Sequence, residues 1–413
     1  MIPALLRQSE RFRWFWLGQT VSLFGDQITL LALPLAAVLI LDANAATMGY
    51  LFAAGLAPNL IFALHAGAFV DRRGRRRATM IVTDLGRAAV LGSVPVAYAL
   101  GVLTLAQLYA VAFLEGTLSV LFYVSYSTLF TSLVPRERYV EGNQLMSGSR
   151  AFSFVGGQSL AGFLVQLITA PFALVVDAAS FVVSAFFLSR FRAVEPPTEQ
   201  AVRGHLAAGA RFIRRTPILA ASLASTAVVN FFNFVFVALF VLYVTRELHV
   251  RPGVLGVVLG AGAIGGLVGA LATGRIAARI GVGPSFILGS ILFPAPFLLV
   301  PLAGGGKPVV IALLFLAEFG SGFGVMLLDI TAGAIKQALV PDRLRARVSG
   351  AYIVVNYGVR PLGSLTGGLL GSTIGLRPTL WIAAVGGICA VLFLLPSPVP
   401  RLRELPEPAE GFA

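Results

Sequence analysis

The 413-residue sequence has little charge and a single cysteine, and each shortage excludes a class of protein. One cysteine, Cys389, cannot form an internal disulfide or supply a cysteine-based metal site. Because it lies in an apolar run, we expect its side chain to be buried. Charged residues make up 12% of the chain, whereas about 25% is usual for soluble domains. The sequence is therefore neither that of a disulfide-rich protein nor that of an ordinary soluble one.

Apolar residues replace the missing charge and make up 57% of the chain. A helix that crosses the ~30 Å hydrocarbon layer of a membrane needs about 20 of them in succession. Apolar runs between charged residues or Pro and Gly breaks predict twelve such helices, and hence an all-α membrane protein. The first run is too long for a secretory signal. The expected spans are residues 14–41, 48–70, 78–100, 105–131, 143–168, 171–190, 217–245, 253–274, 284–302, 308–332, 348–373 and 376–396.

The net charge of +13 would suit a nucleic-acid-binding protein. The positions of the basic residues decide between this interpretation and a membrane protein with basic cytoplasmic loops. With a cytoplasmic N-terminus, 24 of the 31 Lys and Arg residues fall in the two termini or in the loops after even-numbered spans. An excess of Lys and Arg in cytoplasmic loops is the rule that orients membrane proteins. We therefore expect cytoplasmic termini, contacts with anionic lipid headgroups, and no nucleic-acid partner. The excess of arginine over lysine is typical of a GC-rich bacterial genome and favours a bacterial inner membrane.

Three pairs of segments repeat at nearly one offset, about half the length of the chain. This repeat predicts two six-helix halves in the same orientation, with a substrate site between them near the membrane midplane. The expected parts are an N-terminal half at 1–190, a cytoplasmic linker at 191–216, a C-terminal half at 217–396 and a cytoplasmic tail at 397–413. The pairs are LVPRERYVEGNQ from Leu133 with LVPDRLRARVSG from Leu339, SLAGFL from Ser159 with SLTGGL from Ser364, and Gly67-x6-Gly74 with Gly274-x6-Gly281.

Two glycine-rich segments match nucleotide-binding patterns but stand in the wrong context. GAGAIG at Gly260–Gly265 lies inside an apolar run and follows no strand, so its glycines favour close helix packing instead. GGGK at Gly304–Lys307 lacks the first glycine of a phosphate-binding loop, and Pro308 follows it. We expect no cofactor, no metal site and no enzymatic activity, so uphill transport would need an ion gradient.

The segment GAFVDRRGRRR resembles the loop signature G-x-x-x-D-x-x-G-[RK]-[RK] of the major facilitator superfamily. The matching residues are Gly67, Asp71, Gly74, Arg75 and Arg76. SLFGDQIT, TDLGRA and HLAAGARFIRRTPIL are similar to the macrolide-efflux and enterobactin-exporter branch of that superfamily. The resemblance covers residues 12–396. It implies a monomeric secondary transporter that exports drug-like amphipathic molecules by alternating access.

The resemblance also implies a role for Asp71. In the family this carboxylate faces the N-terminal end of the eleventh span, near Arg345–Gly350, where free N–H groups and the helix dipole favour a negative charge. Such a contact would hold the two halves together on the cytoplasmic side while the site opens outward. The second copy has Ala278 at the matching position, so we expect the contact on one side only. The arginines of the loop are explained without such a contact, because an excess of basic residues keeps a loop on the cytoplasmic side of the membrane.

Charged residues inside membrane spans are costly and are therefore candidates for function. Asp84 and Arg87 are spaced i, i+3 on one helix face and are expected to pair, either locally or in support of the cytoplasmic contact. Asp177 and Asp329 are expected near the outer and inner faces, within reach of water or headgroups.

Asp26, Glu115 and Glu318 fall near mid-span in the first, fourth and tenth helices, which line the central cavity in the family. Desolvation disfavours the charged form of a carboxylate, so these residues can take up and release protons. This predicts proton antiport. However, Ala112 replaces the arginine of the family's fourth-helix signature, and GGQSLAG at 156–162 departs from its antiporter signature. An uncoupled facilitator of a metabolite, siderophore or lysolipid therefore stays open, as does a non-transporting membrane sensor.

The remaining polar candidates inside spans are two arginines, two asparagines and a histidine. Arg150 and Arg360 could be counter-ions to the carboxylates or could hold an anionic substrate. Asn230 and Asn233, beside several phenylalanines of the seventh span, could line the cavity. His65 could relay protons or simply bond to the backbone.

Overall fold

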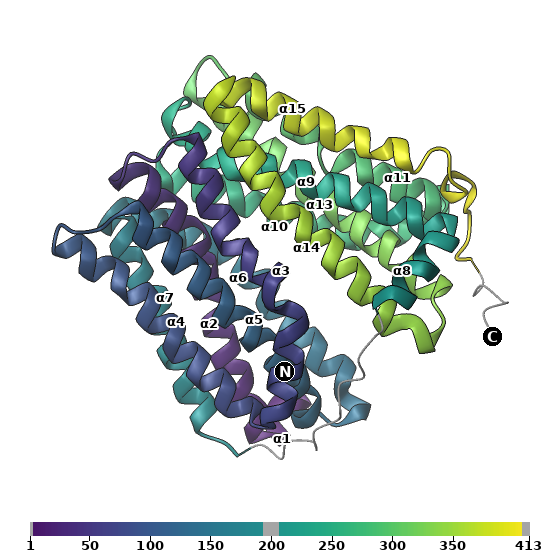
Figure 1. Ribbon diagram of the computed structural model, residues 1–413, viewed down its shortest axis with the longest axis horizontal. Helices are drawn as coiled ribbons and strands as arrows, with labels where there is room; N and C mark the ends of the chain where they lie inside the picture. The colour runs from purple at the N-terminus through teal and green to yellow at the C-terminus, as the bar shows by residue number, and fades with distance from the viewer. Residues whose placement is uncertain (1–2, 193–205, 407–413) are drawn as a thin grey trace. The chain divides into compact units, whose positions relative to one another are not determined.

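The computed structural model describes residues 3–192 and 206–406, and helices form most of this part of the chain (Figure 1). Eleven helices within these residues are long and apolar enough to cross a membrane. The span expected at 348–373 lies in α14 (Asp342–Thr373), which has sufficient length at 32 residues but is not among the eleven. Asn356, Arg360 and frequent Gly and Ser residues make this helix less apolar. The all-α membrane fold is confirmed, whereas the count of twelve spans is not.

The helices group into two compact units. Of the described residues, the first unit contains 3–47, 54–192 and 250–260, and the second contains 48–53, 206–249 and 261–406. Most of the predicted linker, residues 193–205, lies outside the described residues. The division into two six-helix halves therefore stays a prediction.

The helices of the chain are long and are joined by short connections. Before the linker they are α1 (Ala4–Gln8), α2 (Glu10–Ile40), α3 (Ala45–Arg73), α4 (Arg76–Ala99), α5 (Leu105–Leu133), the 3-10 turn η1 (Arg136–Arg138), α6 (Tyr139–Ile168) and α7 (Ala170–Ser189). After it they are α8 (Leu206–Arg215), α9 (Pro217–Arg246), α10 (Pro252–Ile280), α11 (Val282–Leu292), η2 (Ala295–Leu298), α12 (Leu299–Leu302), α13 (Lys307–Leu339), α14, α15 (Leu376–Cys389), η3 (Ala390–Phe393) and η4 (Val399–Arg401).

In the first unit, α2 packs against α6 and α7, and α4 packs against α5 and α7. Small residues allow the closest of these approaches. A Cβ atom built on Gly25 of α2 would overlap Asp177 and Ser180 of α7. Small residues at helix interfaces let backbones come close in membranes, where there is little hydrophobic force between helices. Gly25 therefore sets the distance between α2 and α7.

In the second unit, α9 packs against α14 and α15, and α11 packs against α13. Here too glycines stand at the contacts. A Cβ atom on Gly363 of α14 would overlap the carbonyl oxygen of Phe231 in α9, and one on Gly367 would lie 2.7 Å from the carbonyl oxygen of Val235. The side chains of α14 near these glycines are therefore held close to α9.

One predicted span is a broken helix. Residues Val282–Leu302 are apolar enough to cross a membrane, but the α-helix ends at Leu292 and a 3-10 turn, Ala295–Leu298, follows it. Pro294, Pro296 and Pro301 explain the break, because proline has no N–H to donate and its ring clashes with the preceding turn.

The repeated glycine pair has a structural reason. Gly74 follows α3 with a φ of 59°, and Gly281 follows α10 with a φ of 95°. Residues with a side chain rarely adopt positive φ, so glycine is favoured where a helix ends in this way. The two copies of the pattern thus end two helices in the same manner.

The C-terminal part of the predicted linker is a helix. In α8, Phe212 and Ile213 are buried, whereas Arg211 and Arg214 are exposed. A Cβ atom on Gly209 would overlap the carbonyl oxygen of Arg347, so α8 lies directly on α14. This helix belongs to the second unit rather than to a flexible connection.

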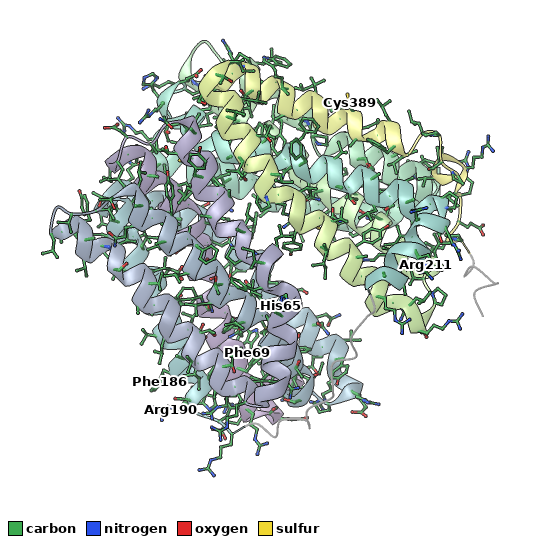
Figure 2. All side chains as sticks on the ribbon, viewed as in Figure 1. His65, Phe69, Phe186, Arg190, Arg211 and Cys389 are labelled. Carbon is green, nitrogen blue, oxygen red and sulfur yellow. The ribbon has the colours of Figure 1, made fainter. Side chains whose placement is uncertain are left out.

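Cys389 is exposed at the end of α15, contrary to the expectation of burial (Figure 2). Its place in an apolar run indicated an apolar environment, and in a membrane protein lipid supplies such an environment at the surface. The apolar pattern therefore did not distinguish a packed position from a lipid-facing one.

Candidate functional site

A buried arginine lies at the centre of the first unit. Arg87 of α4 is 1% exposed and pairs with Asp84, one turn earlier on the same helix, which is 0% exposed. The predicted pair is therefore present. The guanidinium carbon of Arg87 lies 4.4 Å from the ring centre of Phe122 and 4.0 Å from that of Phe181. Aromatic faces attract cations, so helices α5 and α7 enclose the arginine between two rings.

Arg87 also reaches two further carboxylates. Its Nη1 lies 3.7 Å from Oδ1 of Asp26 on α2, whose side chain is 23% exposed. The same nitrogen donates to the Ser119 hydroxyl at 3.4 Å, and this hydroxyl donates to Oε1 of Glu115 at 2.7 Å. Asp26 and Glu115, predicted separately, are thus joined through one arginine. The sequence interpretation missed Ser119, which gave no signal beyond its i, i+4 spacing from Glu115.

The sequence predicted that Asp177 of α7 would lie within reach of water or headgroups. This expectation is wrong. The side chain of Asp177 is fully buried. It accepts hydrogen bonds from the hydroxyls of Thr29 and Ser180, the latter at 2.9 Å. The close packing of α2 on α7 at Gly25 encloses it. The apolar run around Asp177 gave no indication of this depth, because the burial comes from a neighbouring helix.

The first unit therefore holds more acidic than basic groups in its interior. Four carboxylates lie within spans, at Asp26, Asp84, Glu115 and Asp177. Among residues 3–192, Arg87 forms ion pairs with Asp84 and Asp26, reaches Glu115 through Ser119, and does not bond to Asp177. Arg150 of α6 is not a counter-ion in this arrangement. It is exposed, and its guanidinium carbon lies 5.9 Å from the ring centre of Tyr126.

The second unit has an arginine in a different environment. Arg360 of α14 is half-buried, and its Nε donates to Oδ1 of Asn230 on α9 at 3.1 Å. The guanidinium carbon lies 4.1 Å from the ring centre of Tyr357 and 5.2 Å from that of Phe234. Asn356, which the sequence interpretation missed, accepts a hydrogen bond from Asn230 at 3.1 Å.

The other candidates of the second unit stand apart from this group. Glu318 of α13 is half-buried and lies against α10 at Gly262. In the described part of the chain neither Glu318 nor Asn233 makes a side-chain hydrogen bond or ion pair, and Asp329 is exposed. The structure thus joins Arg360 and Asn230. Glu318 bonds to neither of them, and Asp329 attracts Arg360 only from beyond ion-pair distance.

The residues of the loop signature lie in different surroundings. Gly74 ends α3, as described above, and Gly67 has open space around it. Arg75 is exposed and Arg76 is buried. The side chain of Asp71 lies outside the described residues, so its predicted contact stays a prediction.

The neighbouring Arg77, treated in the sequence only as part of a basic loop, has a defined place. Its Nε donates to the carbonyl of Leu188 at 2.7 Å and its Nη2 to that of Ser189 at 2.8 Å. It therefore binds the C-terminal end of α7, where a positive charge is favoured by the helix dipole.

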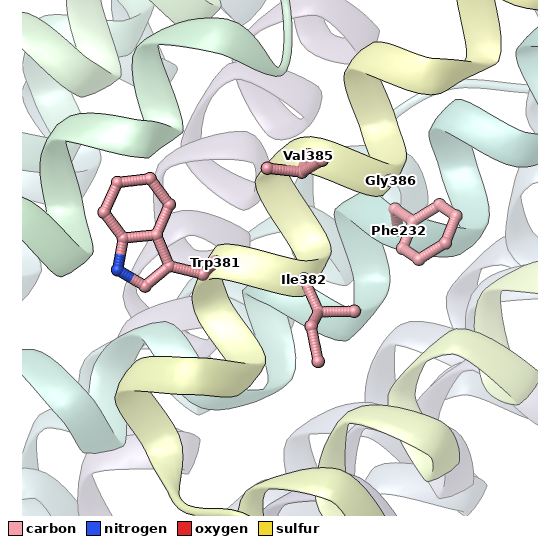
Figure 3. Close-up of a pocket in the computed structure, with 5 residues that line it drawn as sticks. All are labelled: Phe232, Trp381, Ile382, Val385 and Gly386. Atoms are coloured by element: carbon pink, nitrogen blue, oxygen red, sulfur yellow. The ribbon is translucent and has the colours of Figure 1, made fainter.

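Two other features carry no polar site. His65 is exposed on α3 (Figure 2). An open cavity of about 390 Å³ between α9 and α15 is lined by apolar side chains and one glycine, and none of the candidate polar residues reaches it (Figure 3). Its lining residues are Phe232, Trp381, Ile382, Val385 and Gly386.

Eleven candidate spans, several of which carry charged residues in their interior, define a class of protein. Charges inside a membrane are rare and mark the pathways of ions or solutes, so this arrangement is typical of a multi-pass membrane transporter. The sequence matches the Major Facilitator Superfamily over residues 15–357 and 223–412, and the chain belongs to that family.

Characterised and uncharacterised transporters are similar over almost the whole chain. The multidrug efflux pump Tap of Mycobacterium bovis (strain BCG / Pasteur 1173P2) is 27% identical over 399 residues, which cover 92% of this chain and 91% of that protein. YfiS of Bacillus subtilis (strain 168), an uncharacterized MFS-type transporter, is 26% identical over 390 residues, covering 91% and 90%.

Solved structures share the fold. A bacterial homologue of the iron transporter ferroportin, in an inward-facing state, matches with a TM-score of 0.76 at 17% identity, covering 95% of this chain and 99% of that one. The nucleoside transporter NupG matches with a TM-score of 0.76 at 13% identity, covering 94% and 98%. At these identities the likeness concerns the fold alone.

Proposed function

We propose that this transporter exports amphipathic organic molecules in exchange for protons by alternating access. One observation carries the proposal: buried Arg87 lies between Asp84 and Asp26, and a single hydroxyl separates it from Glu115. The similarity to multidrug efflux pumps supports the substrate class.

The balance of charge supports proton coupling. If all four carboxylates of the first unit were ionised, one arginine could neutralise only one of them. Buried charges without a partner cost several kcal/mol, so proton binding stabilises the unit. A proton on Asp26 removes its attraction to Arg87. Proton uptake therefore changes the force between α2 and α4, which is the kind of coupling that antiport needs.

A transport assay with three probes tests this function. Protein in proteoliposomes receives ethidium as a cation, Nile red as a neutral dye and naphthylacetate as an anion, with and without an imposed pH gradient. We expect at least one probe to accumulate above its equilibrium level only with the gradient, and a protonophore should abolish this. Equal movement without a gradient would instead indicate an uncoupled facilitator. Failure to bind or move any probe would indicate a non-transporting sensor.

The setting of the transporter is also part of the proposal. We infer a monomer in a bacterial inner membrane with cytoplasmic termini, since the excess of Arg in alternate loops supports this orientation. With Cys389 replaced by Ser, an impermeant thiol reagent added to spheroplasts should label Asn44→Cys and spare Gln200→Cys. The reverse labelling pattern would overturn the orientation.

The cytoplasmic contact of Asp71 with the start of α14 is proposed on the family signature. Asp71→Asn should shift the transporter toward the inward-open state. Spin labels at the cytoplasmic ends of α3 and α14 should then move apart, and unchanged distances would leave Asp71 as an ordinary loop residue.

A further inference from the structure

Arg360 is a half-buried charge in α14 that forms no ion pair within the described part of its own unit, and Asp329 attracts it only from beyond ion-pair distance. Its guanidinium has five N–H groups, and one of them donates to Asn230. Among residues 206–406, the other four make no hydrogen bond and no carboxylate lies within 4.0 Å of the group. Asp329, which could have been its counter-ion, forms no ion pair with it. The terminal nitrogens of Arg360 are therefore available to a ligand.

The side chain is held in place on its other sides. Tyr357 and Phe234 lie beside the guanidinium. Asn230 is fixed in turn, because it donates to the Thr226 carbonyl at 2.9 Å and to Asn356. Gly363, one turn after Arg360, brings α14 close to α9. The Nε edge of the guanidinium is thus oriented by protein, whereas the Nη edge is left open.

The depth of Arg360 limits which anion can reach it. It lies 18 residues after Asp342 and 13 before Thr373, the two ends of α14. At 1.5 Å per residue these are distances of about 27 and 20 Å along the helix. Lipid headgroups lie at the membrane surface, so a headgroup phosphate does not meet the guanidinium at this level. The anion that meets it would therefore be one that enters the protein itself.

We propose that Arg360 binds the anionic group of the transported molecule, so that the substrate class is an amphipathic organic anion such as an aromatic carboxylate. This rests on the proposed function. Arginine and carboxylate form two parallel charge-assisted hydrogen bonds, and such bonds are stronger in a partly buried site than in water. The aromatic segment of α9 around Phe231 and Phe234 provides apolar surface for the rest of the molecule.

Binding of two matched probes tests the proposal without any gradient. Naphthylacetate and its neutral amide, naphthylacetamide, are titrated into the full-length protein in lipid nanodiscs by calorimetry. We expect the carboxylate to bind about tenfold more tightly or better, the change that about 1.4 kcal/mol gives. Arg360→Gln should remove this preference and leave amide binding unchanged. Arg360→Lys should keep part of it, because lysine retains the charge but not the planar pair of donors.

Controls separate this site from general charge effects. Arg343→Gln removes a charge from an exposed position of the same helix and should leave the preference intact. Equal binding of both probes to the wild type, no binding of either, or a preserved preference in Arg360→Gln would overturn the proposal. Because no gradient is applied, these outcomes leave proton-driven transport of cationic or neutral probes to be judged separately.

Discussion

Arg87 and Arg360 both lie in long helices beside two aromatic rings, but they differ in burial and in the charge of their partners. Arg87 is enclosed, and it pairs with Asp84 and Asp26. Arg360 is half-open and its polar partner is an amide, Asn230. The first arginine is thus neutralised by carboxylates within its unit, although its Nε has no hydrogen-bond partner among the described residues, whereas the second keeps most of its donors free. The charge of the neighbouring side chains, and not the residue type, therefore separates an arginine that is neutralised within its unit from one that keeps donors available.

The largest effect is expected when the enclosed arginine is removed. Arg87→Gln leaves Asp84 buried without a cation, and breaking a buried pair in this way costs about 3–5 kcal/mol. We expect a strong loss of stability in the purified protein, measured by SDS-induced unfolding, and no gradient-driven transport.

Arg360→Gln is the matched change in the second unit. It leaves no carboxylate unpaired, so its effect on unfolding should be about 1 kcal/mol or less, the usual size for one hydrogen bond. Similar losses of stability in the two variants would contradict the distinction between an enclosed and an open arginine.

The next effect concerns the carboxylates. Asp26→Asn keeps the shape of the side chain but cannot release a proton, so uphill transport should be lost while downhill exchange survives. Glu318→Gln should retain uphill transport, because Glu318 has no cation whose pairing a proton could change among the described residues. The measurement is accumulation in proteoliposomes with and without a pH gradient. Retention by Asp26→Asn would place the coupling site elsewhere.

Some of this arrangement could be predicted from the sequence and some could not. The Asp84–Arg87 pair was predictable, because an i, i+3 spacing on a helix fixes which side chains meet. The contacts of Arg87 with Asp26 and Ser119 were not, since they depend on how closely α2, α4 and α5 pack. The burial of Asp177 depends in the same way on a glycine in another helix.

The same limit explains the wrong expectation for Cys389 and the unconfirmed count of spans. The pattern of apolar residues gives the length of a span but not the side that faces lipid, so the exposure of Cys389 was missed. The pattern predicted twelve spans by run length, yet α14 carries polar residues such as Asn356 and Arg360 that pair with α9. A helix can be long and still carry polar residues, which lower its mean hydropathy.

A further prediction tests the packing that encloses the first unit. Gly25→Ala places a Cβ atom against Asp177 and Ser180, and overpacking of this kind costs about 1–3 kcal/mol. We expect a lower midpoint of SDS-induced unfolding and weaker uphill transport, because α2 carries Asp26. Gly92→Ala in α4 is the control, since a Cβ atom there meets none of the described residues within 4 Å. Equal unfolding midpoints for the two variants would mean that α2 and α7 are not held together at Gly25.

The last prediction converts the open arginine into an enclosed one. Asn230→Asp replaces the amide oxygen 3.1 Å from Arg360 Nε with a carboxylate of nearly the same shape. Arg360 then has a carboxylate partner, as Arg87 has in Asp84. The new pair neutralises the guanidinium, and an anionic ligand then meets no net positive charge. The preference for naphthylacetate over naphthylacetamide should fall from about tenfold to about equal, with little change in stability, because the charge is added next to its partner. Asn233→Asp adds the same charge on the same helix at a residue that does not bond to Arg360, and it should reduce the preference less. If both variants reduce it equally, general repulsion and not pairing with Arg360 governs anion binding.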